Sequence, residues 1–275
     1  MVLFDNAVFF KAPIIRWLQV LDILFIMPAI KTVKQGVIKQ FFKGKKVIKL
    51  PIRALFEEKN FGLLKITFGL LWLGLIAYAF LLAPPNQPDT FELIKNLSTG
   101  RWQGINPLVI ALFNLMGIWP LVYSAVLFVD GKGQKIPAWP FAAASFAVGA
   151  FALLPYLVLR EPNTQFSGEK NILIKFLDSR WTGIILTIGA AILVGYGIGQ
   201  GDWSDFVHQW QTSRFINVMS CDFCLLCVLF PTLLGDDMTR RSWKSSGIFW
   251  LFALIPLFGS LLYLCIRPSL PEVSQ

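Results

Sequence analysis

Six long apolar stretches constrain the fold of this chain more than any other feature. Each has about the 20 residues that an α-helix needs to cross the hydrocarbon core of a bilayer. The expected spans are 62–83, 107–129, 138–159, 182–200, 215–234 and 246–266. The sequence therefore predicts an all-α, polytopic bundle of about six transmembrane helices over residues 62–267, with a short tail at 268–275.

The composition favours lipid over water as the solvent of these helices. Of the 275 residues, 55% are hydrophobic and 15% are charged, whereas a soluble domain carries about 25% charged residues. Tryptophans also lie near several ends of the expected spans, where an indole ring suits the headgroup region. They are Trp102, Trp139, Trp181, Trp203 and Trp243.

Most of the net charge of +9 comes from the chain before the first span. We interpret residues 1–61 as a basic, amphipathic segment on the membrane surface, and residues 12–30 as interfacial rather than spanning. A basic block beside a span predicts a cytoplasmic or stromal N-terminus and contact with anionic lipid headgroups. No nucleic-acid-binding motif accompanies the charge, so nucleic acid is not an expected partner. The predicted headgroup contacts are Lys43, Lys45, Lys46 and Lys49.

Two parts of the chain resemble each other. Residues 105–120 share Ile-Asn and aromatic-Pro pairs with 216–231, and Phe-Ala-Leu-Leu-Pro at 151–155 returns as Phe-Ala-Leu-Ile-Pro at 252–256. With six spans, three spans separate the starts of the two copies, so the copies would be inverted across the membrane. Inverted repeats with helix breakers at matching positions are typical of transporters. One observation conflicts with six spans, because Arg240 and Arg241 would then lie in an external loop.

Asp222 is the strongest candidate for a functional residue. It lies inside the fifth expected span, where an ionisable side chain is costly and often functional. Its possible partners are Arg214, Asn114 and Lys65. A structural polar bridge between helices is the alternative interpretation.

Three cysteines give a second candidate site. Cys221, Cys224 and Cys227 recur every three residues and lie roughly along one helix face. Such thiols suit a redox pair, a soft-metal site or part of an iron–sulfur motif, or they are small residues that pack between helices. The single histidine, His208, supplies no pair of haem ligands. Because no catalytic or nucleotide-binding motif is present, we predict no catalytic, cofactor-binding or metal-binding residues and no enzymatic activity.

The segments 113–120, 136–141 and 152–156 resemble an uncharacterised family of cyanobacterial and plastid multipass membrane proteins. Residues 214–218 and 236–238 are similar to a second block of that family, and the likeness covers roughly residues 100–245. The resemblance implies a thylakoid or cytoplasmic membrane in a photosynthetic organism. It brings no activity and no site residues.

Three functions follow from these patterns. The first is a non-enzymatic assembly or stabilising factor for a membrane complex, because cofactor ligands and intramembrane charges are few. The second is a small secondary transporter built on inverted paired hairpins, with Asp222 as the coupling group. The third is a thiol-redox membrane protein.

Overall fold

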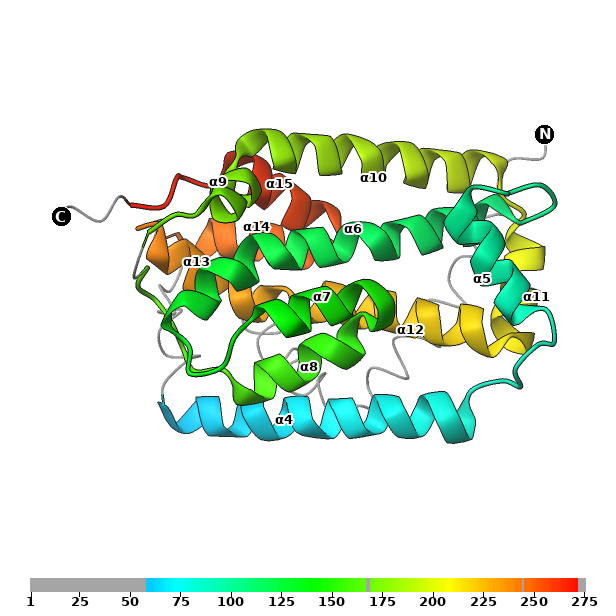
Figure 1. Cartoon of the computed structure of the whole chain (residues 1–275), viewed down its shortest axis with the longest axis horizontal. Coiled ribbons are helices and arrows are strands. Elements are labelled where there is room, and N and C mark those ends of the chain that lie inside the picture. The colour runs from blue at the N-terminus through cyan, green and yellow to red at the C-terminus, as the bar shows by residue number, and fades with distance from the viewer. Residues whose placement is uncertain (1–57, 167–168, 244, 272–275) are drawn as a thin grey trace, which may run out of the picture. The chain divides into compact units, whose positions relative to one another are not determined.

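A computed structural model describes residues 58–166, 169–243 and 245–271, which belong to one contact unit, residues 51–275. The described residues form helices and no strands (Figure 1). The predicted surface segment, its interfacial stretch 12–30 and the lipid-contacting Lys43, Lys45, Lys46 and Lys49 lie outside the described residues.

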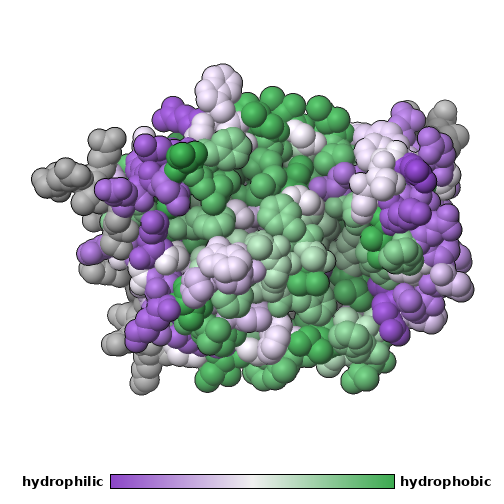
Figure 2. All heavy atoms as spheres, in the orientation of Figure 1, coloured by the Kyte–Doolittle hydropathy of each residue, from purple (hydrophilic) through white to green (hydrophobic). Residues whose placement is uncertain are grey.

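Among the described residues, four helices are long and apolar enough to cross a membrane, over Phe61–Leu82, Pro107–Gly133, Arg180–Gln200 and Arg214–Arg240. The first consists of α4 (Glu58–Ala77) and a π-helical turn, η1 (Tyr78–Leu82); the second of α6 (Pro107–Asp130) and a 3-10 turn, η2 (Gly131–Gly133). The third is α10 (Arg180–Gln200), and the fourth joins α12 (Arg214–Leu229) to α13 (Pro231–Arg240). Figure 2 shows hydrophobic residues in a band between two hydrophilic ends of this unit. The chain is therefore an integral membrane protein.

Short helices lie at both ends of these four. At one end, called the α5 end below, are α5 (Thr90–Thr99) and α11 (Trp203–Thr212) (Figure 1). At the opposite end, the α9 end, are α9 (Ile172–Asp178) and the loop that follows α6. Asn106 ties the α5 end together, because its Nδ2 donates to the Asp202 carbonyl at 2.7 Å.

The third expected span is wrong as a single crossing. It consists of two ten-residue helices, α7 (Trp139–Val148) and α8 (Ala150–Leu159), joined at Gly149. Ten residues rise only about 15 Å, half of the hydrocarbon core. Gly149 has φ 51°, a conformation that favours glycine, and the chain turns back there. Gln134 and the backbone of Glu161 exchange hydrogen bonds of 2.7 and 2.8 Å, so both ends of the pair lie at the α9 end.

The sixth expected span is also two helices, α14 (Ser246–Leu254) and α15 (Phe258–Ile266), separated at Leu257 with φ 58°. Its two ends meet as well, since Arg241 Nη1 donates to the Pro268 carbonyl at 2.6 Å. Both pairs are therefore re-entrant hairpins that enter from the α9 end. The sequence prediction failed because a 20-residue apolar run suits one long helix and two short ones equally.

The two copies are parallel and not inverted as expected. The central helices α6 and α12–α13 begin together, with Phe113 and Phe215 rings 6.4 Å apart. They also end together, with Arg240 2.7 Å from Asp130. Each copy contains an outer span (α4 or α10), a surface helix, a central span and a re-entrant hairpin. Among the described residues, each copy has two helices long enough to cross, so the second copy begins on the same side as the first.

Candidate functional site

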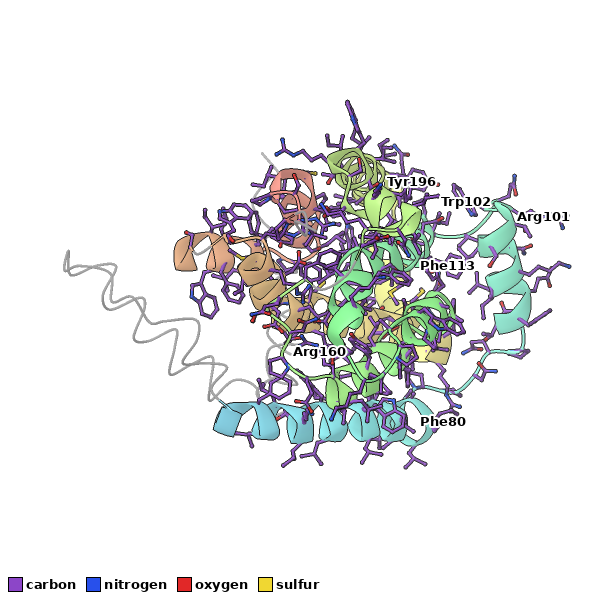
Figure 3. All side chains as sticks on the ribbon, turned by 60° about the vertical axis from the view of Figure 1, so that its left-hand side comes forward. Phe80, Arg101, Trp102, Phe113, Arg160 and Tyr196 are labelled. Atoms are coloured by element: carbon purple, nitrogen blue, oxygen red, sulfur yellow. The ribbon has the colours of Figure 1, made fainter. Side chains whose placement is uncertain are left out.

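A buried carboxylate lies at the base of the first re-entrant hairpin. Asp130, the last residue of α6, accepts hydrogen bonds from Tyr156 Oη at 2.6 Å and from Arg160 at 2.8 and 3.0 Å. Tyr156 lies on α8 and Arg160 follows it, so this triad fastens α8 to α6. Figure 3 shows Arg160 among the packed helices, whereas Arg101 and Trp102 lie at the outer edge beside α5.

The same triad recurs 107 residues later in the second copy. Asp237 of α13 accepts a hydrogen bond from Tyr263 Oη at 2.6 Å and another from Arg267 Nη1 at 3.3 Å. Tyr263 lies on α15, and Arg267 follows that helix as Arg160 follows α8. The equivalent contacts show that both hairpins are held at their bases by the same device.

Arg240 joins the two triads. Its guanidinium is 2.7 Å from Asp130 and 3.1 Å from Asp237. Arg160 also pairs with Asp236 of the second copy. With Arg241 and Asp178, which pair at 2.7 Å, four arginines and four aspartates form one electrically balanced group. We call it the ion-pair cluster: Asp130, Arg160, Asp178, Asp236, Asp237, Arg240, Arg241 and Arg267.

Burial determines what the ion-pair cluster does. Its side chains are at most 8% exposed. Removing a charge from water costs several kcal/mol unless a partner and hydrogen bonds offset it, and losing one partner of a buried pair costs about 3–5 kcal/mol. The cluster therefore holds the two copies and both hairpins in one fixed arrangement at the α9 end.

A second site lies at the tip of the first hairpin, away from the ion-pair cluster at its base. Ala150 N, the first amide of α8, donates to Asp222 Oδ1 at 2.7 Å. Asp222 comes from α12 of the other copy and is only 5% exposed. A Cβ built at Gly149 would overlap the Asp222 carboxylate, so the close approach requires glycine. The carboxylate supplies the negative charge that a helix N-terminus favours.

The expected partners of Asp222 bind elsewhere, so that prediction is wrong. Arg214 Nε donates to the Pro84 carbonyl at 3.0 Å, and Asn114 Nδ2 donates to Ile110 of its own helix at 2.8 Å. Lys65 pairs with Glu161 at 2.7 Å. Sequence alone placed Asp222 inside a span, but its true partner is a backbone amide.

The three cysteines lie half-buried on α12 with free thiols. Cys221 Sγ is 4.0 Å from Asn217 Oδ1. In the described ranges, no three histidine, cysteine or acidic side chains form a group suited to a metal ion. The thiol-redox hypothesis stays a prediction.

Sequence reasoning missed the ion-pair cluster. Its residues come at the ends of apolar runs, where charges are normally solvated. A signal was present: the spacing Asp-x25-Tyr-x3-Arg occurs at 130–160 and again at 237–267.

Comparison of the chain with models of known protein families, with curated proteins and with solved structures gives no match. The geometry alone defines the class: an integral membrane protein with two parallel copies of one helical unit, each ending in a re-entrant hairpin.

Proposed function

We propose that the protein is a small secondary transporter built on two parallel repeats, with Asp222 as its proton- or cation-coupling group. One observation supports this most: the helix break of one repeat meets an acidic side chain of the other. Transporters bind substrates and coupling ions near the bilayer midplane, where discontinuous helices meet at the repeat interface.

The position of this contact agrees with the proposal. Asp222 is eight residues beyond the start of α12, or about 12 Å along the helix axis. The tip of the hairpin is ten residues from its base, or about 15 Å. In a hydrocarbon core of about 30 Å, both estimates place the carboxylate near the middle.

Coupling would act through this hydrogen bond. The ionised carboxylate is attracted to the N-terminus of α8. A proton or a bound cation neutralises that charge, weakens the contact with Ala150 and frees the tip of the hairpin to move against α12. The ion-pair cluster holds the base of the hairpin meanwhile, so movement is confined to the tip.

The test uses the purified full chain in liposomes that contain a dye sensitive to H⁺, Na⁺ or K⁺, matched to the gradient applied. A pH, Na⁺ or K⁺ gradient is imposed, and the small-molecule fraction of a cell extract is added as a pool of substrates. We expect gradient-driven flux that Asp222→Asn abolishes at an unchanged protein level. Glu169→Gln, which removes an exposed carboxylate at the α9 end, is the matched control and should keep the flux. Flux that survives Asp222→Asn, or wild-type protein that moves no ion, would end the proposal.

We further propose that the α9 end faces the cytoplasm or stroma. Exposed basic residues there are Lys132, Lys135, Lys175 and Arg180. The α5 end carries only two exposed basic residues among those the structure describes, Lys95 and Arg101, beside the exposed acidic residues Asp89, Glu92, Asp202 and Asp205. Positive charge remains on the inner side of a membrane, and Arg240 and Arg241 no longer conflict with that rule. The location in a photosynthetic membrane stays a prediction from the family resemblance.

An assembly or stabilising factor for a membrane complex is a second candidate. Its support is the ion-pair cluster, which neutralises its own charges and fixes a shape, as a scaffold requires. The outer faces of α4 and α10 expose apolar side chains, such as Leu70 and Ile185, that suit lipid or a membrane partner. Co-purification in mild detergent tests this candidate. Asp222→Asn separates the two, because a scaffold should keep its partner and a transporter should lose its flux.

A further inference from the structure

A pocket of about 560 Å³ opens at the α5 end. It lies between α5 and α11, which are the matching surface helices of the two copies, and beside the first residues of α6 and α12. Its volume is in the range of small-molecule sites, about 300–1,000 Å³. The pocket is therefore built from equivalent elements of both repeats, at the end of the molecule opposite the ion-pair cluster.

The side chains that line this pocket carry negative charge. Asp89 and Glu92 contribute carboxylates and His208 an imidazole, and the lining residues include no lysine or arginine. Amides of Asn96 and Gln209 add hydrogen-bonding groups. This chemistry attracts a cation with polar hydrogens.

Within the described ranges, the carboxylates of Asp89 and Glu92 have no hydrogen-bond or ion-pair partner. Asp89 precedes α5, but its side chain makes no capping hydrogen bond. Asp202 holds the same position before α11 and does cap that helix, through Ser204 N at 2.8 Å and Asp205 N at 3.1 Å. A carboxylate at a helix start normally binds the first amides, so the difference between the copies leaves Asp89 available to a ligand.

Part of the pocket lining is apolar. Leu93 and Ile105 line the pocket, are partly buried, and pack against a buried cluster that includes Val109, Ile110 and Ile216. A ligand with a short hydrocarbon chain can bury that chain on these residues while its ammonium groups meet the carboxylates. A bare metal ion fits less well, because no group of three suitable ligands is present among the described residues.

From these features we infer that the pocket binds a small organic cation, an amine with one or more ammonium groups on a short carbon chain. The inference rests on the proposed transport function only for the role of the pocket, which would be the entry site for substrate at the α5 end. Binding itself is independent of transport.

Calorimetric titration of the full chain in detergent at low salt tests the inference, with 1,4-diaminobutane as the probe. 1,4-Butanediol, which has the same length and no charge, is the control ligand. We expect the diamine to bind and the diol not to bind. Replacing both carboxylates, Asp89→Asn with Glu92→Gln, should weaken binding by about tenfold, because two partly exposed charge pairs are lost. Glu169→Gln should leave binding unchanged.

A further variant, His208→Arg, places a fixed positive charge in the pocket and should also weaken binding. Asp89, Glu92 and His208 are exposed, so these variants should melt at the wild-type temperature. Wild-type protein that does not bind the diamine, equal binding of diamine and diol, or full binding by the double variant would overturn the inference. Carboxylate-dependent binding without any ion flux would support the amine-binding site and refute transport. Ion flux without amine binding would support transport and refute the site.

Discussion

Asp130 and Arg240 belong to different repeats, and their contact predicts how strongly the repeats depend on each other. Both side chains are 0% exposed and lie 2.7 Å apart. Asp130→Asn removes the charge that Arg160 and Arg240 share. Each arginine keeps a second aspartate, so we expect a loss near the lower end of the range for a broken buried pair, about 3 kcal/mol.

That loss corresponds to a melting temperature lowered by roughly 6–12 °C for a chain of this size. Thermal unfolding of purified protein, followed by the reaction of its cysteines with a thiol-reactive dye, measures the shift. Arg240→Gln alone should cost a similar amount. Combined with Asp130→Asn it restores charge balance, so the double variant should lose about 2 kcal/mol less than the sum of the single losses.

Arg214→Gln is the matched control, because Arg214 contacts the Pro84 carbonyl at the α5 end. Its effect should add to that of Asp130→Asn within about 0.5 kcal/mol. If the Asp130 and Arg240 losses are simply additive too, the two repeats are not coupled through this pair, and the role assigned to the ion-pair cluster is wrong.

Three further predictions follow from the hairpins. Gly149→Ala should lower stability by about 1–3 kcal/mol, because a left-handed φ and an overlapping carboxylate both oppose a side chain there; unchanged melting would refute the tight contact. Tyr156→Phe and Tyr263→Phe should each lower the free energy of unfolding by about 1–3 kcal/mol, and by similar amounts, since each leaves a buried aspartate short of one hydrogen bond. Clearly different melting temperatures of the two variants would show that the triads are not equivalent. In a cysteine-free background, Lys132→Cys and Glu169→Cys should react with a membrane-impermeant maleimide from the same side, whereas six spans require opposite sides.

Much of the helical core followed from hydropathy. The spans expected at 62–83, 107–129, 182–200 and 215–234 correspond to the four long helices, because length and apolar content alone determine them. The re-entrant hairpins did not follow, since their composition equals that of a span and the turn depends on the backbone at Gly149 and Leu257. The predicted inverted arrangement was wrong for the same reason. Counting the first hairpin as one crossing places the next helix on the wrong side of the membrane.

The site was predictable only in part. Asp222 was recognisable as an ionisable residue inside a span, but its contact with Ala150 joins positions 72 apart, and no local pattern reports such a distance. The ion-pair cluster was missed for the same reason, because its contacts also join positions far apart in the sequence. Arg160 and Arg267 become buried only because each hairpin returns to its starting side, which a count of six crossings hides.

The parallel direction of the two copies has a consequence for how such a chain can be assembled from two like halves. Each copy has two crossings and one hairpin that returns, so its end lies on the side where it began. Two molecules of a half-length protein that always inserts in one orientation could pair side by side in the membrane. Their arrangement, related by an axis normal to the bilayer, would match that of the two copies. Gene fusion would then need neither an added helix nor an ancestor that inserted both ways round. Each copy still carries its own Asp-Tyr-Arg triad, as the subunits of a symmetric dimer would.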